Sequence, residues 1–574
     1  MITPAPGLVS GRRLLMATLL IGALLAVPVA LASPDPPDPP APARLPARTP
    51  STAVSDTQVA AERQYSALAH EDERLLALVG SVRPGSGPYV DQVNGQDTLV
   101  LTARGPAYGL RDLRAVGAVT SLPDGSVLLT QSVLVAPGAR LVIDAPGTTL
   151  RLRSDGGGFV SLVAWKADLV LAGKEQAPLR VSSWDPGAEG PDSEVVDGRA
   201  YIREVSGDMQ VRYADVSHLG FWAGRTSGVA WTGNSSTVAT GAIVGSTFQA
   251  NHYGAFASQG QKLSVVDSAF TSNAVDGLAL HRSTQETTIR SSSAQSNGRH
   301  GFSADRGSES VTLVGVTAAR NRAYGVFFSG ESLSAGQSAG GAPLRTYGEV
   351  EVEGGELREN GKAGLRVVEG HRVVVRGTRV ADNRDGIVLA GTAAPTTVEK
   401  TVVTGVHRLG ISVTGGSAAV SANRVSGGET GIRIRDAAVA VTGNVVDRST
   451  GHAVSVLGRA TGSSVVGNTV SGRGPSGLDT FRLASGVSID TSRNDVTGWT
   501  QDRDNGEYWS AFVPSHPMLV LWVVILGVPL AVGLRARNRR IPLGTAPYAD
   551  PIRRERPVPL RVDVGGAMTP RGSG

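Results

Sequence analysis

Short runs of alternating apolar and polar residues fill most of the chain from about residue 99 onward. An alternation with a period of two predicts β-strands, and the Gly, Asn and Asp residues between the runs predict tight turns. Residues 55–80, in contrast, have helical spacing and few helix breakers. We therefore expect a short helical stalk over 55–80, followed by an all-β region over 99–500.

The strand pattern is a repeat. A glycine followed by alternating apolar residues recurs at spacings of 21 to 24 residues, with a single spacing of 39. These column glycines are Gly254, Gly277, Gly301, Gly325, Gly364, Gly386, Gly410 and Gly431. The long spacing contains a Ser- and Gly-rich stretch of about fifteen extra residues, which we expect to be a surface insertion.

A second set of apolar positions keeps the same period. Leu263, Thr287 and Val311 are 24 residues apart, and so are Val265, Ile289 and Leu313. A unit of this length cannot bury its own apolar side, but stacked units share one continuous core. Propeller blades need about 40 residues, and the leucine-rich repeat frame is missing. The pattern therefore favours a right-handed parallel β-helix solenoid.

Some positions of each coil should face outward. Residues one and three after a column glycine are mostly apolar and should face the core. Because successive side chains of a strand point to opposite faces, the residues next to them should point away from the core. Because parallel coils stack in register, polar residues at equivalent positions should gather into one patch. The patch consists of Tyr253, His281, Arg282, His300, Asp305, Arg306 and Tyr324.

Composition and charge exclude several classes of protein. The chain has no cysteine, which excludes disulfide frameworks, zinc ribbons, iron–sulfur clusters and thiol nucleophiles. Its net charge is +5, but the segment after residue 534 carries +6, so the rest of the chain sums to −1. A nearly neutral body lacks the charged groove of a nucleic-acid-binding protein. We expect no nucleic-acid partner.

The N-terminal segment has the elements of an export signal. Arg12 and Arg13 precede an apolar run over 14–32 that ends in small residues. This pattern predicts either a cleaved signal peptide or an uncleaved signal anchor over 1–32. Residues 33–54 include eight prolines among positions 33–50 and read as a stiff, extended linker.

A second apolar run over 518–534 has the features of a membrane-spanning helix. Arginines follow it at once, beginning with Arg535, while Tyr508 and Trp509 stand just before it. Basic residues on one flank and aromatic residues on the other fit the positive-inside rule and the interfacial aromatic belt. We expect a single span with the β-helix outside the cell membrane and a basic cytoplasmic tail over 535–574.

The outward patch contains the groups that uronic-acid chemistry needs. Removing the C5 proton of a uronate requires an arginine that neutralises its carboxylate and a base such as histidine or tyrosine. A donor on the opposite side then completes epimerisation, or a leaving group departs in β-elimination. Solenoids also carry such polar ladders merely for solubility, so both interpretations stay open. Clustered carboxylates for a calcium-dependent lyase are missing from the outward positions.

The run of residues from Asn273 to Phe328 resembles the right-handed β-helix family that includes the periplasmic mannuronan (alginate) C5-epimerases. That family carries an Asp-Pro-His-Asp motif on one coil and a His-Gly run ending in Arg on the next. The resemblance places His281 at the base position and Arg306 at the arginine position, and His300-Gly301 matches as well. The motif aspartates are replaced by Ala279 and Arg282, and the proline by Leu280.

These observations predict an exported, membrane-tethered protein that acts as a monomer on an acidic extracellular polysaccharide, with no cofactor and no metal ion. The expected catalytic residues are His281, Arg306 and Tyr324. The expected substrate-binding residues are Tyr253, Arg282, His300 and Asp305. An epimerase-like or lyase-like enzyme is the first hypothesis, and a non-catalytic carbohydrate-binding or cell-envelope scaffold protein is the alternative.

Overall fold

The computed structural model describes residues 56–234, 236–333 and 345–502. Contacts divide the chain into Met1–Tyr508 and Trp509–Gly574, and all described residues belong to the first unit. The expected export signal, proline-rich linker, C-terminal span and basic tail lie outside the described residues, as does most of the expected insertion. Among the helices that the structure describes, none is long and apolar enough to cross a membrane.

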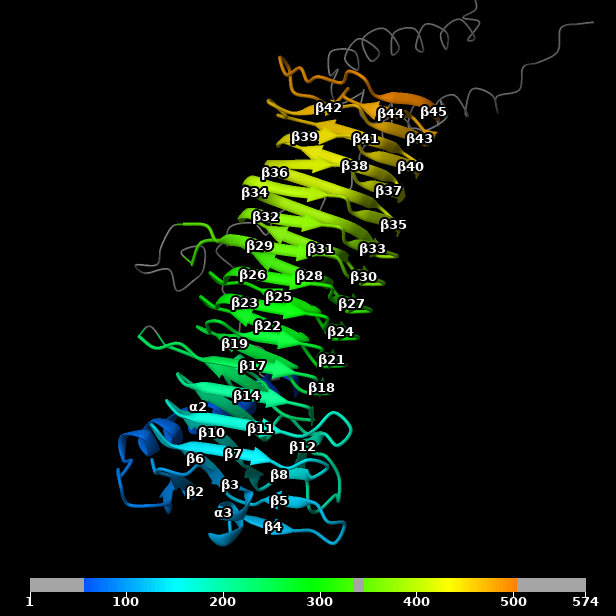
Figure 1. Ribbon diagram of the computed structural model, residues 1–574. Helices are drawn as coiled ribbons and strands as arrows, with labels where there is room; N and C mark the ends of the chain where they lie inside the picture. The colour runs from blue at the N-terminus through cyan, green and yellow to red at the C-terminus, as the bar shows by residue number, and fades with distance from the viewer. Residues whose placement is uncertain (1–55, 235, 334–344, 503–574) are drawn as a thin grey trace, which may run out of the picture. The chain divides into compact units, whose positions relative to one another are not determined.

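The repeats form a parallel β-helix, in which each coil contributes one strand to each of three stacked faces (Figure 1). The strands of the first face are β2 (Gln96–Leu101), β6 (Ser132–Val135), β10 (Ser161–Trp165), β13 (Tyr201–Val205), β16 (Val229–Thr232), β19 (Ala255–Ser258), β22 (Leu278–His281), β25 (Phe302–Ala304), β28 (Tyr324–Ser329), β31 (Ala363–Val368), β34 (Asp385–Glu399), β36 (Leu409–Ser421), β38 (Thr430–Arg435), β41 (His452–Leu457) and β44 (Ser476–Asp479). Long strands β34 and β36 continue from the first face into the second.

The second face runs beside the first. Its strands are β3 (Tyr108–Gly109), β7 (Arg140–Asp144), β11 (Asp168–Ala172), β14 (Asp208–Arg212), β17 (Thr240–Val244), β20 (Ser264–Val266), β23 (Gln285–Arg290), β26 (Glu309–Val314), β29 (Gly348–Glu353), β32 (His371–Arg376), β39 (Ala438–Thr442) and β42 (Ser464–Val466). Here Val265 is paired with Ile289, and Ile289 with Leu313. All three side chains are buried in the continuous core, which confirms the second set of apolar positions.

The third face completes each coil. Its strands are β5 (Val127–Leu129), β8 (Thr149–Asp155), β12 (Leu179–Trp184), β15 (Ala214–Ser217), β18 (Thr247–Gln249), β21 (Ala269–Thr271), β24 (Ser293–Gln295), β27 (Thr317–Ala319), β30 (Glu356–Arg358), β33 (Arg379–Ala381), β35 (Val402–Val406), β37 (Arg424–Gly427), β40 (Val445–Ser449), β43 (Thr469–Gly474) and β45 (Asp495–Gln501). Strands β1 (Tyr89–Val93), β4 (Val119–Ser121) and β9 (Gly158–Phe159) pair antiparallel with β2, β5 and β8. The short helix α3 spans Leu110–Ala115, and the 3₁₀ turn η1 spans Gly224–Thr226.

The column glycines stand just before or at the start of the first-face strands, as the repeat predicted. Their neighbours leave no room for a side chain. A Cβ atom at Gly277 would lie 2.6 Å from the carbonyl oxygen of Gly301, and one at Gly301 would meet Gly325 at the same distance. Glycine is therefore required here because the backbone of the next coil approaches closely.

Two rows of buried asparagines also join the coils, and sequence analysis missed them. The Nδ2 of one asparagine donates to the Oδ1 of the next at 2.9–3.0 Å, and backbone carbonyls take its second proton. The first row is Asn273, Asn297, Asn321, Asn360 and Asn383, and the second is Asn423, Asn444, Asn468 and Asn494. Each buried amide is thus satisfied by its equivalent one coil away.

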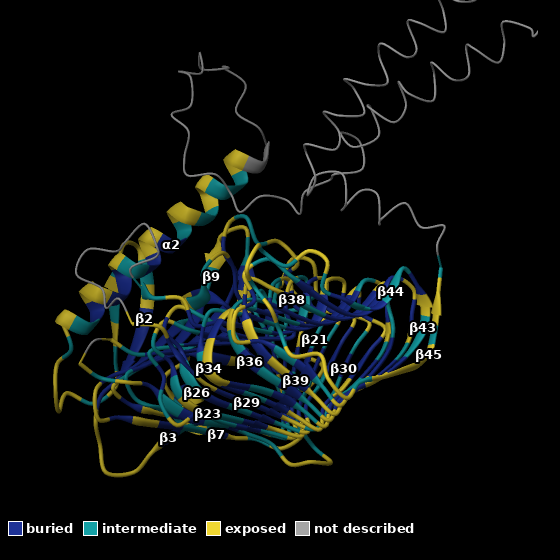
Figure 2. Ribbon diagram, turned by 90° about the horizontal axis from the view of Figure 1, so that it is seen from above, coloured by how far each residue is buried: buried dark blue, intermediate teal, exposed yellow. Residues whose placement is uncertain are grey.

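The helix over 55–80 exists as α2 (Asp56–Gly80), but it is not a stalk. It lies against the outer side of the first coils, beside β2 and β9 (Figure 2). Leu68, Leu75 and Leu78 are buried there in one cluster with Val100 and Leu134 of the first face. The expectation of a stalk is wrong because the apolar side of the helix has a partner surface on the solenoid.

A buried ion pair fixes α2 in place. Arg74 donates two hydrogen bonds to Glu71, at 2.7 and 2.6 Å, and it also reaches Thr98 and Ser161 on the coils. The hydroxyl of Tyr201 donates to the same carboxylate. Each charge is therefore compensated within the interface.

Replacing Arg74 by methionine should lower the free energy of unfolding by about 3–5 kcal/mol, because the Glu71 carboxylate would remain buried without its cation. Urea unfolding followed by circular dichroism measures this loss. The matched control is Arg225→Met, which breaks an exposed ion pair with Asp72 on the same helix and should cost less than about 1 kcal/mol. Equal losses in the two variants would contradict the role of the buried pair.

Candidate functional site

The outer side of the first face becomes accessible only after the coils that α2 covers. Beyond them, Ala230, Phe256 and Ala279 form a small buried cluster with Tyr253 packed against it. The turn η1 closes over this cluster, since a Cβ at Gly224 would lie 2.2 Å from the ring of Phe256. The predicted patch begins at Tyr253, just before β19, and its histidines and charged residues follow from β22 onward.

His281 and Asp305 form the central contact of the patch. His281 ends β22 and Asp305 directly follows β25, on the next coil, which places the two side chains next to each other. The Nδ1 of His281 lies 2.5 Å from the Oδ1 of Asp305, and the side chains are 37% and 29% exposed. An ionised carboxylate can only accept, so the proton of the neutral imidazole sits on Nδ1 and Nε2 keeps a lone pair.

Arg282 and Arg306 flank this pair in two stacked turns. Both residues adopt left-handed backbone angles, with φ of 41° and 52°, and both are exposed. Neither guanidinium makes a hydrogen bond or ion pair with any residue in the described ranges. Arg282 and Arg306 directly follow His281 and Asp305 in the chain, so two cations without a partner among the described residues stand next to this pair in sequence and are able to hold a carboxylate of a ligand.

A second charged pair, which sequence analysis did not predict, lies at the opposite ends of these strands. Arg299 donates two hydrogen bonds to the fully buried carboxylate of Asp276, at 2.8 and 2.6 Å. Asp276 also accepts from the backbone N–H of His300 and from the hydroxyl of Ser303. The hydrogen bonds with Asp276 raise the pKa of Arg299. Asp276 directly precedes the column glycine Gly277, but no pattern in the sequence identifies Arg299 as its partner.

His300 is buried beneath aromatic rings. Its imidazole stacks on Tyr324 and on Phe327, with ring centroids 5.1 and 4.9 Å away and planes within 16°. Burial lowers the pKa of His300 to about 4, and its buried Nδ1 has no hydrogen-bond partner among the described residues. At neutral pH His300 is therefore uncharged and supports the rings of Tyr324 and Phe327.

Because of this burial, His300 should make the stability of the protein sensitive to mild acid. The unfolded chain takes up a proton at an ordinary histidine pKa of about 6.5, whereas the folded protein does so only near 4. Between these values the unfolded state binds more protons, so stability falls as the pH falls, and no such loss occurs above pH ~6.5. Urea unfolding at pH 4.5 and 7 should show a smaller difference in His300→Phe than in the wild type. An unchanged difference would contradict this assignment.

The two tyrosines of the patch occupy different places. Tyr253 contacts the edge of Phe256, which in turn lies 5.7 Å from the ring of His281. Burial raises the pKa of Tyr253, so its hydroxyl stays protonated. Tyr324 lies on β28, two coils beyond β22, with the cations of Lys362 and Arg366 about 6 Å from its ring. Tyr253 thus stands just before β19, at the amino ends of the strands, with the ring of Phe256 between it and His281.

No metal site is evident in the described part of the chain, where no group of three or more His, Asp or Glu residues could hold an ion. The residues of the patch and their neighbours instead divide into two arrangements. His281, Arg282, Asp305 and Arg306 stand at the carboxyl ends of the strands. Asp276, Arg299 and the aromatic rings stand at the amino ends, where a sugar ring could stack.

Comparisons with known proteins agree with this architecture. A family model described as a right handed beta helix region matches residues 209–336 and 335–470. No curated protein sequence matches the chain. The crystal structure of a point mutant of the periplasmic alginate epimerase AlgG is similar with a TM-score of 0.50 at 14% identity, covering 69% of this chain and 85% of that one.

Two further solved structures align with lower scores. The A-module of the Azotobacter vinelandii mannuronan C-5 epimerase AlgE6 has a TM-score of 0.41 at 15% identity, covering 69% of this chain and all of that one. The catalytic unit of the GH87 α-1,3-glucanase from Streptomyces thermodiastaticus has a TM-score of 0.36 at 12% identity, covering 71% of each chain. The chain is a right-handed parallel β-helix protein with the fold of the periplasmic alginate epimerase.

Proposed function

We propose that the protein is exported, tethered to the cell membrane, and acts on an extracellular polysaccharide that contains uronate, by C5 epimerisation or β-elimination. The observation that carries the proposal is the hydrogen bond between His281 and Asp305, next to Arg282 and Arg306, which have no partner in the described part of the chain. The fold shared with an alginate epimerase supports a polysaccharide as the ligand.

The His281–Asp305 pair supplies the base. With its Nδ1 proton held by Asp305, the imidazole presents the Nε2 lone pair, which can remove the C5 proton of a bound uronate. Asp305 stabilises the imidazolium that forms, so that proton transfer does not leave an isolated positive charge. Asp305 therefore acts as a positioning residue, which differs from its predicted role in substrate binding.

Arg306 and Arg282 supply the positive charge that the reaction needs. Proton loss from C5 places negative charge on the uronate carboxylate, and a guanidinium that donates two hydrogen bonds stabilises that charge. For epimerisation a proton must return from the other side of the sugar. Tyr253, whose hydroxyl is protonated, stands at the opposite ends of the strands from His281, across the ring of Phe256, and is the proposed donor. Tyr324 would stack on a neighbouring sugar, together with Phe327.

The alternative is a non-catalytic protein that holds an acidic polysaccharide at the cell envelope. It is favoured by Ala279 and Arg282, which stand where the resembling epimerases carry motif aspartates. The buried Asp276 and the stacked rings fit a binding surface equally well. The two functions predict the same ligand and differ only in proton exchange at C5.

The full-length protein should therefore be incubated in D₂O with mannuronan, pectate and glucuronan oligomers. Proton NMR detects deuterium at C5, and ultraviolet absorbance detects the unsaturated ends that β-elimination produces. Exchange or unsaturation with one of these polymers supports the enzyme. Binding without either signal in all three polymers supports the non-catalytic alternative.

The membrane tether makes a separate prediction. If residues 55–515 lie outside the cytoplasm and 535–574 inside, protease added to intact protoplasts should digest the β-helix and leave a protected C-terminal fragment. A tag after Gly574 detects this fragment on a blot. A tag placed after Ser55 serves as the control and should be lost. Complete digestion of the C-terminal tag in intact protoplasts would contradict the single span.

A further inference from the structure

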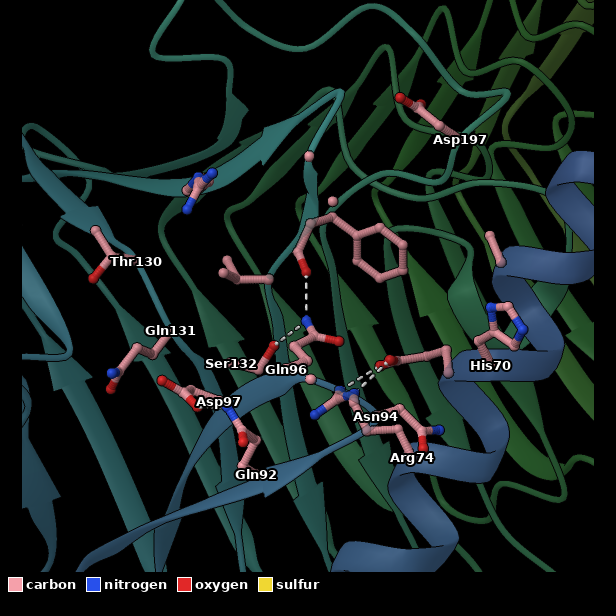
Figure 3. A pocket seen from close by; sticks show the side chains of 18 of the residues that line it. His70, Arg74, Gln92, Asn94, Gln96, Asp97, Thr130, Gln131, Ser132 and Asp197 are labelled. Atoms are coloured by element: carbon pink, nitrogen blue, oxygen red, sulfur yellow. Dashed lines mark hydrogen bonds and ion pairs between the residues drawn. The ribbon is translucent and has the colours of Figure 1, made fainter.

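A cavity at one end of the solenoid lies away from the His281 patch. It has a volume of about 1050 Å³ and opens between α2, the β1–β2 hairpin and the β8–β9 hairpin (Figure 3). Its first-face strands are the early ones, up to β10, and the coils of β13 and β16 separate it from β19, where the patch begins. Nothing in the chemistry proposed above uses this space.

Amide side chains are one part of the hydrogen-bonding surface of the cavity wall, which is lined by Gln92, Asn94, Gln96 and Gln131. Gln92 donates to Asp97 at 3.0 Å, and Gln96 donates to Ser132 and to the carbonyl of Phe159, so that both amides are held in place. The Oε1 of Gln131, which also lines the cavity, is buried and has no hydrogen-bond partner among the described residues. A buried acceptor without a donor costs free energy unless a ligand or water supplies the missing hydrogen bond.

The charges of the wall exclude an acidic ligand. Glu73, Asp97 and Asp197 line the cavity, whereas its Arg153 is already bound to Asp155 at 2.8 Å. The other arginine, Arg74, is neutralised by Glu71. A uronate polymer would be repelled by this surplus of carboxylates, so the cavity is not an extension of the patch.

We propose that this cavity binds an uncharged, hydroxyl-rich sugar segment. Each sugar hydroxyl can both donate and accept a hydrogen bond. It can therefore donate to the carboxylates of the wall, which only accept, and exchange hydrogen bonds with the amides, which do both. Phe159 adds an apolar ring to the wall, against which the face of a pyranose can lie. The protein would then hold a neutral glycan at one end of the solenoid while the patch engages an acidic one. The inference does not depend on the proposed reaction.

Isothermal titration of the full-length protein with cellohexaose, mannohexaose and maltohexaose tests the proposal, with a mannuronate oligomer of the same length as the charged probe. At least one neutral probe should bind. Gln92→Trp, which fills the cavity from an exposed strand position, should abolish that binding. Asp97→Ala, which removes an acceptor, should weaken it by about tenfold or more. Glu175→Gln, at an exposed turn outside the cavity, and His281→Ala should leave it unchanged.

Three results would overturn the proposal. The first is that none of the neutral probes binds. The second is that a neutral probe binds equally well to the wild type and to Gln92→Trp. Circular dichroism of Gln92→Trp confirms that the variant is folded before binding is compared. Loss of the neutral-sugar signal in His281→Ala would also overturn it, because the ligand would then lie in the patch.

Discussion

Replacing His281 by alanine is expected to lower the rate of deuterium incorporation at C5 of a uronate oligomer by at least about 100-fold, the usual cost of a lost general base. The fold should be retained, because the side chain points outward and Asp305 is its one polar partner among the described residues. Asp305→Asn should lower the rate as well, since an amide oxygen accepts the Nδ1 proton but does not stabilise the imidazolium.

The arginines provide the second part of this test. Arg306→Ala should lower the rate by a similar factor, because the charge that develops on the uronate carboxylate loses its donor. Two matched controls are His407→Ala and Arg290→Ala, which remove an exposed histidine and an exposed arginine away from the patch. If His281→Ala keeps its exchange rate while Arg306→Ala only weakens binding of acidic polymers, the non-catalytic function is correct.

Replacing Ile289 by aspartate should destabilise the protein by several kcal/mol. The side chain is 1% exposed and stacks between Val265 and Leu313 of the neighbouring coils, so the new carboxylate would be buried without a partner. Thermal unfolding followed by circular dichroism measures the change. Thr288→Asp is the control, since this neighbouring residue faces outward on the same strand, β23. Identical melting of the two variants would contradict the inward orientation of Ile289.

The solenoid could be predicted from the sequence because the glycine and the alternating apolar residues of each repeat lie close together in the chain. Gly277 and Gly301 mark the points where successive backbones touch, and their period is visible without knowing the partner. The alternation after each glycine then assigns the core side of the strand. The same reasoning brought His281 and Asp305 together, since stacking in register turns a spacing of 24 residues into contact between neighbours.

Features that depend on a partner far along the chain could not be predicted in this way. Asn297 resembles an ordinary turn residue, and only the equivalent asparagine one coil away shows that its amide is buried and satisfied. The helical spacing of residues 55–80 predicted a stalk, and nothing in the sequence showed that Arg74 has its partners Thr98 and Ser161 on the coils. The amino acid types predicted the helix and the turns correctly, but the sequence did not show which coils these residues contact.

The asparagine rows have a consequence for how such a molecule can change in length. Each row joins identical side chains at identical positions, so the segment from Asn273 to Asn297 could be duplicated or deleted as a whole while every remaining amide keeps an equivalent neighbour. An insertion of a few residues within a strand would instead break the row. Growth is therefore quantised in whole coils of about 4.8 Å, and the number of coils sets how much polymer the outer face can span.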